Sequence, residues 1–159
     1  MSARPRPSEK NDFLADHVAI LRDSLRHWAG IELVDPELSR QEAACFLFHA
    51  PFAVVSHDTA KEPIFNYANQ AALNLFDMSW KEFTSLPSRF SAEPAKQAER
   101  ERLLDEVSAH GFINNYSGVR IGRQGRRFFI DNVVVWNLID SASGIHKGQA
   151  ALIRDWRSL

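Results

Sequence analysis

The chain has 159 residues and a mass of 18.1 kDa, with 45% hydrophobic and 11% aromatic side chains, which suits one domain with a buried core. The 19 basic and 20 acidic residues leave a net charge of −1, so no overall electrostatic field directs the protein toward nucleic acid or an anionic membrane. The single cysteine, Cys45, excludes an intramolecular disulfide and a metal site built from several cysteines.

The first eleven residues are polar and contain two Arg-Pro dipeptides. Proline disfavours helix in the residue before it, so we predict a disordered tail over residues 1–11. The tail has positive charge but no apolar run, so it does not resemble a signal peptide. No stretch of the sequence approaches the ~20 apolar residues that span a bilayer. The sequence therefore predicts a cytoplasmic protein with no membrane partner.

An amphipathic helix is predicted over residues 12–29, with Gly30 as its stop. Its apolar side chains recur at alternating spacings of four and three residues, which places them on one stripe. The stripe consists of Leu14, Val18, Leu21, Leu25 and Trp28. Two interpretations are open, because such a stripe can pack on the protein's own domain or form a short coiled-coil-like seam in a homodimer.

A second helix is predicted to begin at a capping box formed by Ser39 and Glu42, in which each side chain bonds the backbone N–H of the other residue. This helix ends before Pro51, which lacks a backbone N–H. The two helices together predict an N-terminal extension over residues 12–50. A second unit, predicted to be a compact domain, follows over residues 51–159.

Short strands and short helices alternate in the middle of the chain. Strands are predicted over residues 52–58 and 64–68, the first with β-branched residues at its centre. Asn69 suits the N-cap of the next helix, because its side chain can accept a bond from an early helical N–H. A second capping box, Ser79 with Glu82, begins another short helix.

A longer helix is predicted over residues 94–110. Leu103, Leu104 and Val107 face inward in this prediction, and the charged residues of the helix, Arg100 among them, form a solvated face.

The remainder of the chain is predicted to be antiparallel sheet. Its strands are joined by glycine-containing turns and cover residues 112–121, 126–140 and 146–156. Both alternating sides of the long central strand are apolar, and regular alternation places Phe128, Ile130 and Trp136 on one side. A sheet with one face in water should alternate with polar residues, so we predict that both faces are covered. Helices cover one face, and the N-terminal helices or a second subunit cover the other.

This order of elements is that of the PAS fold. The run Ile64-Phe-Asn-Tyr-Ala-Asn-Gln-Ala71, followed by Ser79-Trp-Lys-Glu-Phe83, resembles the PAS sequence of a strand and two short helices. The glycine-containing turns before the last two strands resemble the PAS C-terminal hairpin. The resemblance covers roughly residues 45–156. It implies an α+β fold, with a five-stranded antiparallel sheet, short helices and one long helix on one face, and here an N-terminal two-helix extension.

A closer resemblance lies in Phe46-Leu-Phe-His-Ala-Pro-Phe-Ala-Val-Val-Ser-His-Asp58 and Phe65-Asn-Tyr-Ala-Asn69. These segments, with the helices before them, resemble the bacterial stand-alone MEKHLA-domain proteins. That PAS-related domain also occurs at the C-terminus of plant class III homeodomain–leucine-zipper regulators. The chain departs from the plant proteins because it has no homeodomain, no long zipper and no literal Met-Glu-Lys-His-Leu-Ala string. The resemblance therefore implies a sensory or interaction module without a DNA-binding role.

Catalytic and metal-binding patterns are weak. Ser56, His57 and Asp58 are the residue types of a catalytic triad, but successive strand residues point to opposite faces and form no relay. We therefore predict that the protein is not an enzyme. The six histidines contain no pair spaced by four residues and no cluster with Cys45, so no metal site is expected.

The resemblance to PAS domains suggests two cofactors to consider. Haem-binding PAS domains use a histidine on the long helix, and His110 lies at the end of that helix, where the helix dipole explains it equally well. Light-oxygen-voltage domains carry a reactive cysteine after the Asn-containing helix, whereas Cys45 lies before the first strand. The sequence therefore identifies no cofactor.

Four arginines surround one hairpin turn: Arg120, Arg123, Arg126 and Arg127. Such a cluster can contact phosphate. At a near-neutral net charge we interpret it as a solvated rim or as ion-pair partners, and we expect no nucleic-acid partner.

The remaining candidate site is a small-molecule pocket between the helices and the sheet. Its predicted lining combines large apolar side chains with orienting amides. The lining residues are Phe65, Asn69, Trp80, Phe83, Leu104, Asn114, Tyr116, Phe128, Ile130 and Trp136. The same side chains could instead fill a closed core. The first alternative predicts a ligand sensor that signals through its N-terminal helices or dimer, and the second predicts an interaction module without a ligand.

Overall fold

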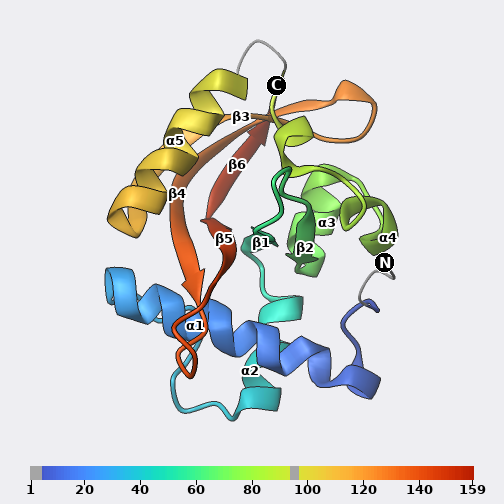
Figure 1. Ribbon diagram of the computed structural model, residues 1–159. Helices are drawn as coiled ribbons and strands as arrows, with labels where there is room; N and C mark the ends of the chain where they lie inside the picture. Colours follow the sequence, from blue (N-terminus) through green and yellow to red (C-terminus); the bar gives the residue numbers. More distant parts are fainter. Residues whose placement is uncertain (1–4, 94–96) are drawn as a thin grey trace.

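The computed structural model describes residues 5–93 and 97–159 and contains one antiparallel sheet with helices against both faces (Figure 1). The strands follow the order β2-β1-β5-β4-β3, and β6 continues the line of β5 by pairing with β4. Their bounds are β1 Ala53–His57, β2 Phe65–Ala68, β3 Phe112–Ile121, β4 Arg127–Ile139, β5 His146–Ile153 and β6 Asp155–Ser158. The predicted α+β fold with a PAS-like antiparallel sheet is confirmed.

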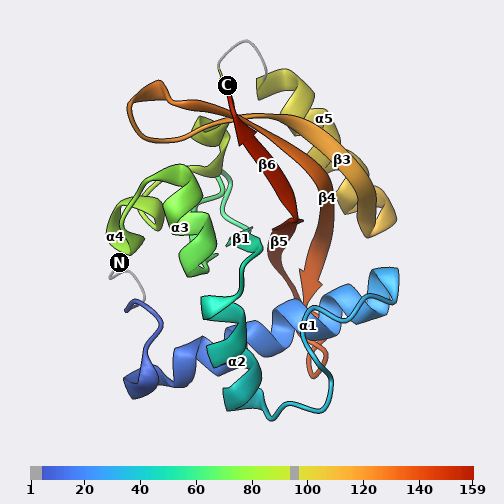
Figure 2. The same ribbon diagram turned by 180° about the vertical axis from the view of Figure 1, so that it is seen from behind.

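The helices differ in which face of the sheet they cover. Helices α3, α4 and α5 lie on one face of the sheet, which we call the inner face (Figures 1 and 2). Helix α1 packs against the opposite face, which we call the outer face, and lies together with α2 at one end of the molecule. Their bounds are α1 Ala15–Ala29, α2 Arg40–His49, α3 Gln70–Phe76, α4 Trp80–Phe83 and α5 Gln97–His110, with 3₁₀ segments at Glu9–Leu14, Ser88–Ser91 and Arg123–Gly125. Within the described ranges, no helix combines the length and the apolar composition needed to cross a membrane.

The predicted helix caps are present. Asn69 accepts a hydrogen bond from the backbone N–H of Ala72 at 3.1 Å, which begins α3. Both capping boxes, Ser39 with Glu42 and Ser79 with Glu82, have their reciprocal bonds. These caps satisfy N–H groups that have no partner inside a helix.

Residues 5–11, which belong to the predicted disordered tail, include a side chain that contacts the rest of the chain. Arg6 Nη2 donates to Gln70 Oε1 at 2.6 Å, and the Arg6 guanidinium lies 5.1 Å from the centre of the Phe48 ring. The 3₁₀ segment Glu9–Leu14 follows and occupies part of the predicted first helix. Residues 1–4, and residues 94–96 at the predicted start of the long helix, lie outside the described residues.

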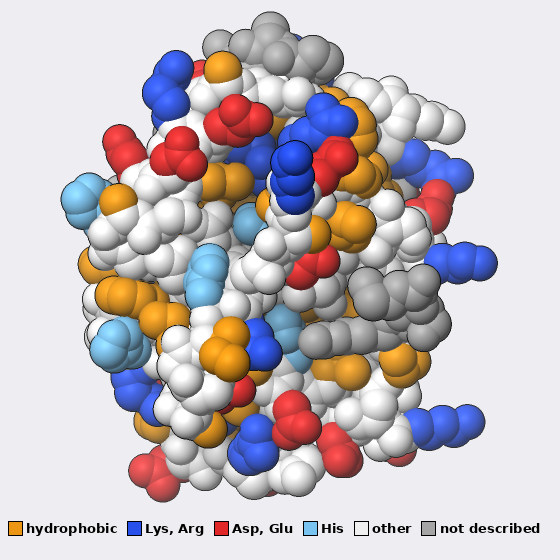
Figure 3. Space-filling model, viewed as in Figure 1, with side chains coloured by type: hydrophobic (Ala, Val, Ile, Leu, Met, Phe, Trp, Pro, Cys, Tyr) orange, Lys and Arg blue, Asp and Glu red, His pale blue; other side chains and the backbone are white. Residues whose placement is uncertain are grey.

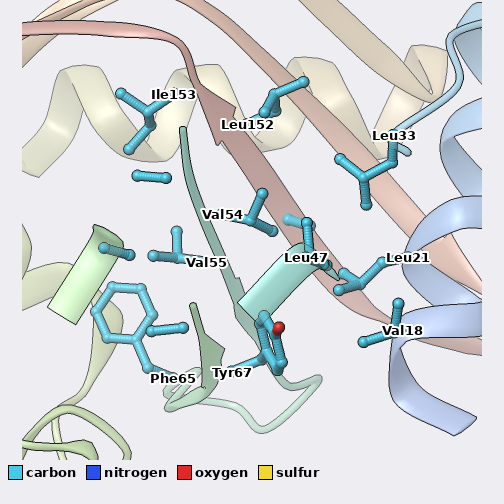
Figure 4. Packing of buried hydrophobic residues seen from close by; sticks show 14 of the residues in the cluster. Val18, Leu21, Leu33, Leu47, Val54, Val55, Phe65, Tyr67, Leu152 and Ile153 are labelled. Atoms are coloured by element: carbon cyan, nitrogen blue, oxygen red, sulfur yellow. The ribbon is translucent and has the colours of Figure 1, made fainter. Parts of the chain in front are cut away.

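Helix α1 packs on the protein's own sheet through the centre of its apolar stripe. Val18, Leu21 and Leu25 are at most 1% exposed, and they belong to the same hydrophobic core as β1 and β4. Figure 4 shows Val18 and Leu21 in this core together with Val54 of β1. Trp136 Nε1 donates to the carbonyl of Leu21 at 3.2 Å. Of the predicted dimer interface, Val18, Leu21 and Leu25 are therefore occupied within the protomer, whereas Leu14 and Trp28 are only partly buried and their role in a dimer stays a prediction.

A kink crosses the sheet and changes which side chains face the helices. Asn115 in β3 and Asn132 in β4 have left-handed backbones, with φ of 61° and 53°. One extra residue in a strand reverses the facing of every residue beyond it. Ile130 and Val133 therefore line the same cavity, although they are three residues apart. Trp136 faces α1 rather than the side that regular alternation from Ile130 predicts.

Candidate functional site

A chamber of about 60 Å³ lies between α5 and the inner face of the sheet. Figure 4 shows the division at β1, where Val55 lies with Phe65 and Ile153 on the chamber side, while Val54 points toward Leu21 of α1. The apolar lining comes from Val55, Phe65, Phe76, Leu103, Leu104, Ile130, Val133, Val135, Ala150, Ala151 and Ile153. The polar lining comes from Ser56, His57, Ser91, Arg100, Tyr116, Arg120 and Gln149.

A wider cleft of about 750 Å³ adjoins the chamber. It is lined by the 58–63 loop, by α5 and by the start of β5. His57, Arg100, Leu104 and Gln149 line both spaces, so they form the boundary between the apolar chamber and the more polar cleft. A ligand that reaches the chamber from the cleft passes these four residues.

Arg100 is buried at this boundary. Its side chain extends from the first half of α5 and donates from Nη2 to Ser88 Oγ at 2.8 Å. Burial, with Arg120 as a nearby like charge, lowers the pKa of Arg100 to about 10. The guanidinium is therefore still charged at neutral pH.

His57 presents an unused acceptor to the chamber and cleft. Its Nδ1 lies 3.0 Å from the carbonyl oxygen of Asp58, so Nδ1 carries the proton and Nε2 is an acceptor. Nε2 is buried and has no hydrogen-bond partner in the described part of the chain. Burial lowers the pKa of His57, and the nearby charges of Arg100 and His146 act in the same direction. The imidazole is therefore held neutral.

A polar network fixes α5 to the sheet beside the chamber. Gln149 Nε2 donates to Asn137 Oδ1 at 3.0 Å and to the carbonyl of Leu104 at 3.1 Å. Asn137 Nδ2 in turn donates to the carbonyl of Val107 at 2.9 Å. The network joins β4, β5 and α5, so the wall formed by α5 has a defined position.

Four of the ten predicted pocket residues line the chamber: Phe65, Leu104, Tyr116 and Ile130. Phe83 and Phe128 pack behind this lining. The Phe83 ring stacks on Phe65 at 4.1 Å between centroids, and Phe128 meets the edge of Phe76 at 5.0 Å. These two aromatic residues fill the core, as the second interpretation of the pattern proposed.

The other four predicted pocket residues lie elsewhere. Asn69 binds the backbone of β1 and of the end of α2, and Asn114 is exposed on β3. Trp80 packs edge-on against Tyr67 at 6.0 Å, and Trp136 is on the face covered by α1. None of these four residues lines the chamber, so the structure does not bring them together with the other predicted pocket residues.

Arg100 and His57 were not among the predicted site residues. Arg100 lies one turn before Leu103 and Leu104, and two turns before Val107, so helical spacing already places it on the inward stripe of α5. Arg100 was predicted to lie on the solvated face because its side chain is charged, although its position on the helix indicates the inward face. His57 alternates with Val55 along β1, which gives the same signal for a chamber-facing side chain.

Ser56 and His57 act on opposite sides of β1. Ser56 Oγ donates to Asn66 Oδ1 at 2.5 Å, and it accepts from His17 Nε2 of α1 at 2.9 Å. His57 faces the chamber and bonds the Asp58 carbonyl, not its carboxylate. The adjacent triad-like residue types therefore do not form a relay with one another.

Cofactor candidates from the sequence lie outside the chamber lining. Cys45 is on α2, with Sγ 3.9 Å from His49 Nδ1, and His110 is exposed at the end of α5. Among residues 5–93 and 97–159, no group of three or more histidine, cysteine or carboxylate side chains is arranged to hold a metal ion.

Two of the four arginines around the hairpin turn form ion pairs with carboxylates. Arg123 Nη1 lies 3.1 Å from Glu82 Oε2, and Arg127 pairs with Glu93. On the face shown in Figure 3, acidic and basic side chains are interspersed. Arg120 differs from these surface arginines because it lines the chamber.

Solved structures with this arrangement are PAS and light-oxygen-voltage sensory domains. A PAS domain from Colwellia psychrerythraea matches with a TM-score of 0.60 and 15% identity, over 70% of this chain and 92% of that chain. A fungal LOV domain photoreceptor matches with a TM-score of 0.59 and 17% identity, over 94% of this chain and 97% of that chain. At these identities the likeness concerns the fold, and the class that it defines is that of PAS-like domains.

Within this class, the chain belongs to the MEKHLA domain family, which it matches over residues 15–158. The Homeobox-leucine zipper protein HOX10 of Oryza sativa subsp. indica is 25% identical over 125 residues, or 77% of this chain. The match covers 15% of HOX10, so the chain corresponds to a small part of that protein. The resemblance inferred from the sequence is confirmed.

Proposed function

We propose that the protein is a non-enzymatic sensory module that binds a small molecule in the chamber between α5 and the sheet. The main observation in support is the unused polar capacity of the chamber wall. His57 Nε2 is buried and has no partner among residues 5–93 and 97–159, whereas buried polar atoms in closed cores are nearly always hydrogen-bonded. A ligand that enters from the adjoining cleft would supply the missing partner.

The contacts around β1 offer a route from the chamber to α1. His57 faces the chamber, while the adjacent Ser56 bonds His17 of α1 through its hydroxyl group. A ligand that displaces β1 would change both contacts together. A ligand shifts a conformational equilibrium only if it binds the two conformations with different affinities. A conformation with displaced β1 would have an altered contact with α1, so this connection supports signalling through the N-terminal helices.

A second connection runs through β4. The carbonyl of Asn137 accepts from Trp28 Nε1 of α1 at 3.1 Å, while its side chain donates to Val107 of α5. Helices on opposite faces of the sheet thus share one residue. If α5 moves when a ligand binds, Asn137 would transmit this movement to α1, because it contacts both helices.

The proposal is tested by native mass spectrometry and thermal denaturation of the purified chain, with a small-metabolite panel. We expect a bound or added compound to raise the melting temperature, since a ligand at 100 times its Kd adds about 2.7 kcal/mol. Ala151→Leu should abolish this stabilisation, because it fills the chamber, whereas Ala142→Leu in an exposed turn should retain it. A bare mass with no stabilising compound contradicts the proposal and favours the alternative, an interaction module with a filled core.

The predicted homodimer remains a prediction. Val18, Leu21 and Leu25 of the stripe on α1 are occupied within the protomer, so a dimer would require other residues. Light scattering at micromolar concentration measures the oligomeric state directly.

A further inference from the structure

Arg100 is a buried cation that forms no salt bridge with a carboxylate in the described part of the chain, and the nearby charge of Glu101 does not outweigh the effect of burial on its pKa. Arg100 is 7% exposed, and its hydrogen bond goes to the neutral hydroxyl group of Ser88. More exposed arginines, such as Arg26 and Arg89, each have a carboxylate within 2.8 Å. A buried charge is normally paired, because removing it from water is expensive. Arg22 is also buried but does not line the chamber.

Arg120 places a second guanidinium near the first. It extends from β3, lines the chamber, and donates from Nη2 to the hydroxyl group of Tyr116 at 3.1 Å. Arg100, Arg120 and Tyr116 also line a second recess of about 140 Å³, which Glu99 lines as well. Two like charges beside an apolar space repel each other, and an anion placed there would relieve the repulsion. Guanidinium groups suit carboxylate and phosphate oxygens, which accept two parallel N–H bonds.

The chamber limits the size of the rest of the ligand. A water-sized group needs roughly 10–15 Å³ on this measure, so the chamber of about 60 Å³ holds roughly four to six such groups. Its deeper wall is apolar, with Val55, Val135 and Ile153 on neighbouring strands. The space therefore fits a short apolar tail, while the cleft leaves room for a polar head at the boundary.

From this arrangement we infer that the chamber takes a small organic anion, whose head binds the guanidinium groups of Arg100 and Arg120 and whose short apolar tail lies among the valines. The inference rests on the proposed function, since it names the class of ligand for the same chamber. His57 Nε2, at the boundary with the cleft, accepts a hydrogen bond from a hydroxyl or amide group on the ligand. Carboxylates and phosphonates share the required charge.

Isothermal titration of the full chain tests the inference with butyrate, its neutral isostere butyramide, and n-propylphosphonate. We expect butyrate or the phosphonate to bind and butyramide to bind at least tenfold more weakly. Preference for butyrate identifies a carboxylate site, and preference for the phosphonate identifies a phosphate-like site. Arg100→Met should weaken binding of the preferred anion roughly 10- to 100-fold, the usual effect of losing a charge-assisted hydrogen bond. Arg102→Met, at an exposed position on the same helix, should leave binding unchanged.

Two further measurements separate a ligand-binding role of Arg100 from a structural one. The unliganded Arg100→Met variant should melt at or above the temperature of the wild type, because it loses a buried unpaired charge. Arg100→Lys, which keeps the charge, should retain part of the anion binding. A large fall in melting temperature with unchanged anion affinity would show a structural role and overturn the inference.

A failure of the anionic ligand class can be distinguished from a failure of the proposed function. If butyramide or any neutral compound from the metabolite panel binds while both anions do not, the anionic class is overturned but the chamber remains a ligand site. If no compound binds and the native mass is that of the bare chain, the proposed function itself fails.

Discussion

Buried polar side chains in this protein differ in whether the chain itself supplies their partners. Asn69 accepts from the backbone N–H groups of Val54 and Ala72 and donates to the carbonyls of Leu47 and Phe52. Among the described residues, His57 Nε2 has no hydrogen-bond partner and Arg100 forms no salt bridge with a carboxylate. The hydrogen bonds of Asn69 stabilise the fold, whereas the side chains of His57 and Arg100 remain available to bind a ligand.

Asn69→Ala should lower the free energy of unfolding by about 3 kcal/mol or more. The substitution removes an N-cap and leaves backbone groups buried without partners, each at a cost of about 1–3 kcal/mol. Asn74→Ala, at an exposed position on the same helix, should change stability by less than about 0.5 kcal/mol. Urea denaturation of both variants measures the difference, and equal losses would contradict the structural role of Asn69.

His57 should make stability depend on pH below neutrality. Burial lowers its pKa in the folded state from the ordinary 6.5, with Arg100 and His146 adding to this effect and Asp58 opposing it. Between 6.5 and the lower value the unfolded chain binds more protons, so stability falls as the pH falls, by at most about 1.4 kcal/mol per pH unit for one proton.

Urea denaturation at pH 7.5, 6.5 and 5.5 checks this dependence. His57→Gln removes the titrating group, so its stability should decline less steeply with falling pH than that of the wild type. If the stability of the wild type and of His57→Gln falls equally with pH, groups other than His57 cause the loss of stability.

At the scale of elements, the kink through β3 and β4 decides which face each side chain occupies. It turns Ile130, Val133 and Val135 toward the chamber and leaves Trp136 against α1. Helix α1 then closes the outer face with the stripe that contains Leu21. The chamber and its outer support therefore both depend on one irregularity in the sheet.

Asn132→Val should destabilise the protein by about 1–3 kcal/mol, because a β-branched side chain is strained at a φ of 53°. Asn132→Gly should be tolerated, since glycine adopts this region freely. Ser117→Val provides a control at an exposed strand position outside the left-handed region, and it should be nearly neutral. Thermal denaturation compares the three, and equal effects of both valines would contradict the importance of the kink.

Leu25→Ala should lower the free energy of unfolding by about 2–5 kcal/mol, the usual range for a buried leucine. Asp16→Ala, whose side chain is 95% exposed, should have a small effect. The destabilisation should not depend on protein concentration, because Leu25 packs within one protomer. A concentration-dependent melting temperature that the substitution abolishes would instead support a dimer seam.

The sequence predicts best where local chemistry determines structure. The caps at Asn69, Ser39 and Ser79 follow from neighbouring residues and were predicted correctly. The position of Trp136 was not, because alternation alone does not reveal the extra residue at Asn132. The stripe on α1 was ambiguous for a different reason, since the same spacing suits a dimer seam and a sheet face.

At the scale of the whole molecule, the chamber and α1 lie on opposite faces of the sheet and are joined through it. Ser56 and Asn137 each connect the two sides, the first through β1 and the second through β4. We expect an anion in the chamber to change the contacts of α1. The indole N–H groups of Trp28 and Trp136 bond the carbonyls of Asn137 and Leu21, so they report on those contacts.

The most direct measurement is a ¹H–¹⁵N NMR titration of the full chain with butyrate or n-propylphosphonate, following the tryptophan indole signals. Trp28 and Trp136 should shift in a saturable manner with the anion, and Arg100→Met should abolish both shifts. Indole signals for Trp28 and Trp136 that stay unchanged at saturating anion would contradict the account.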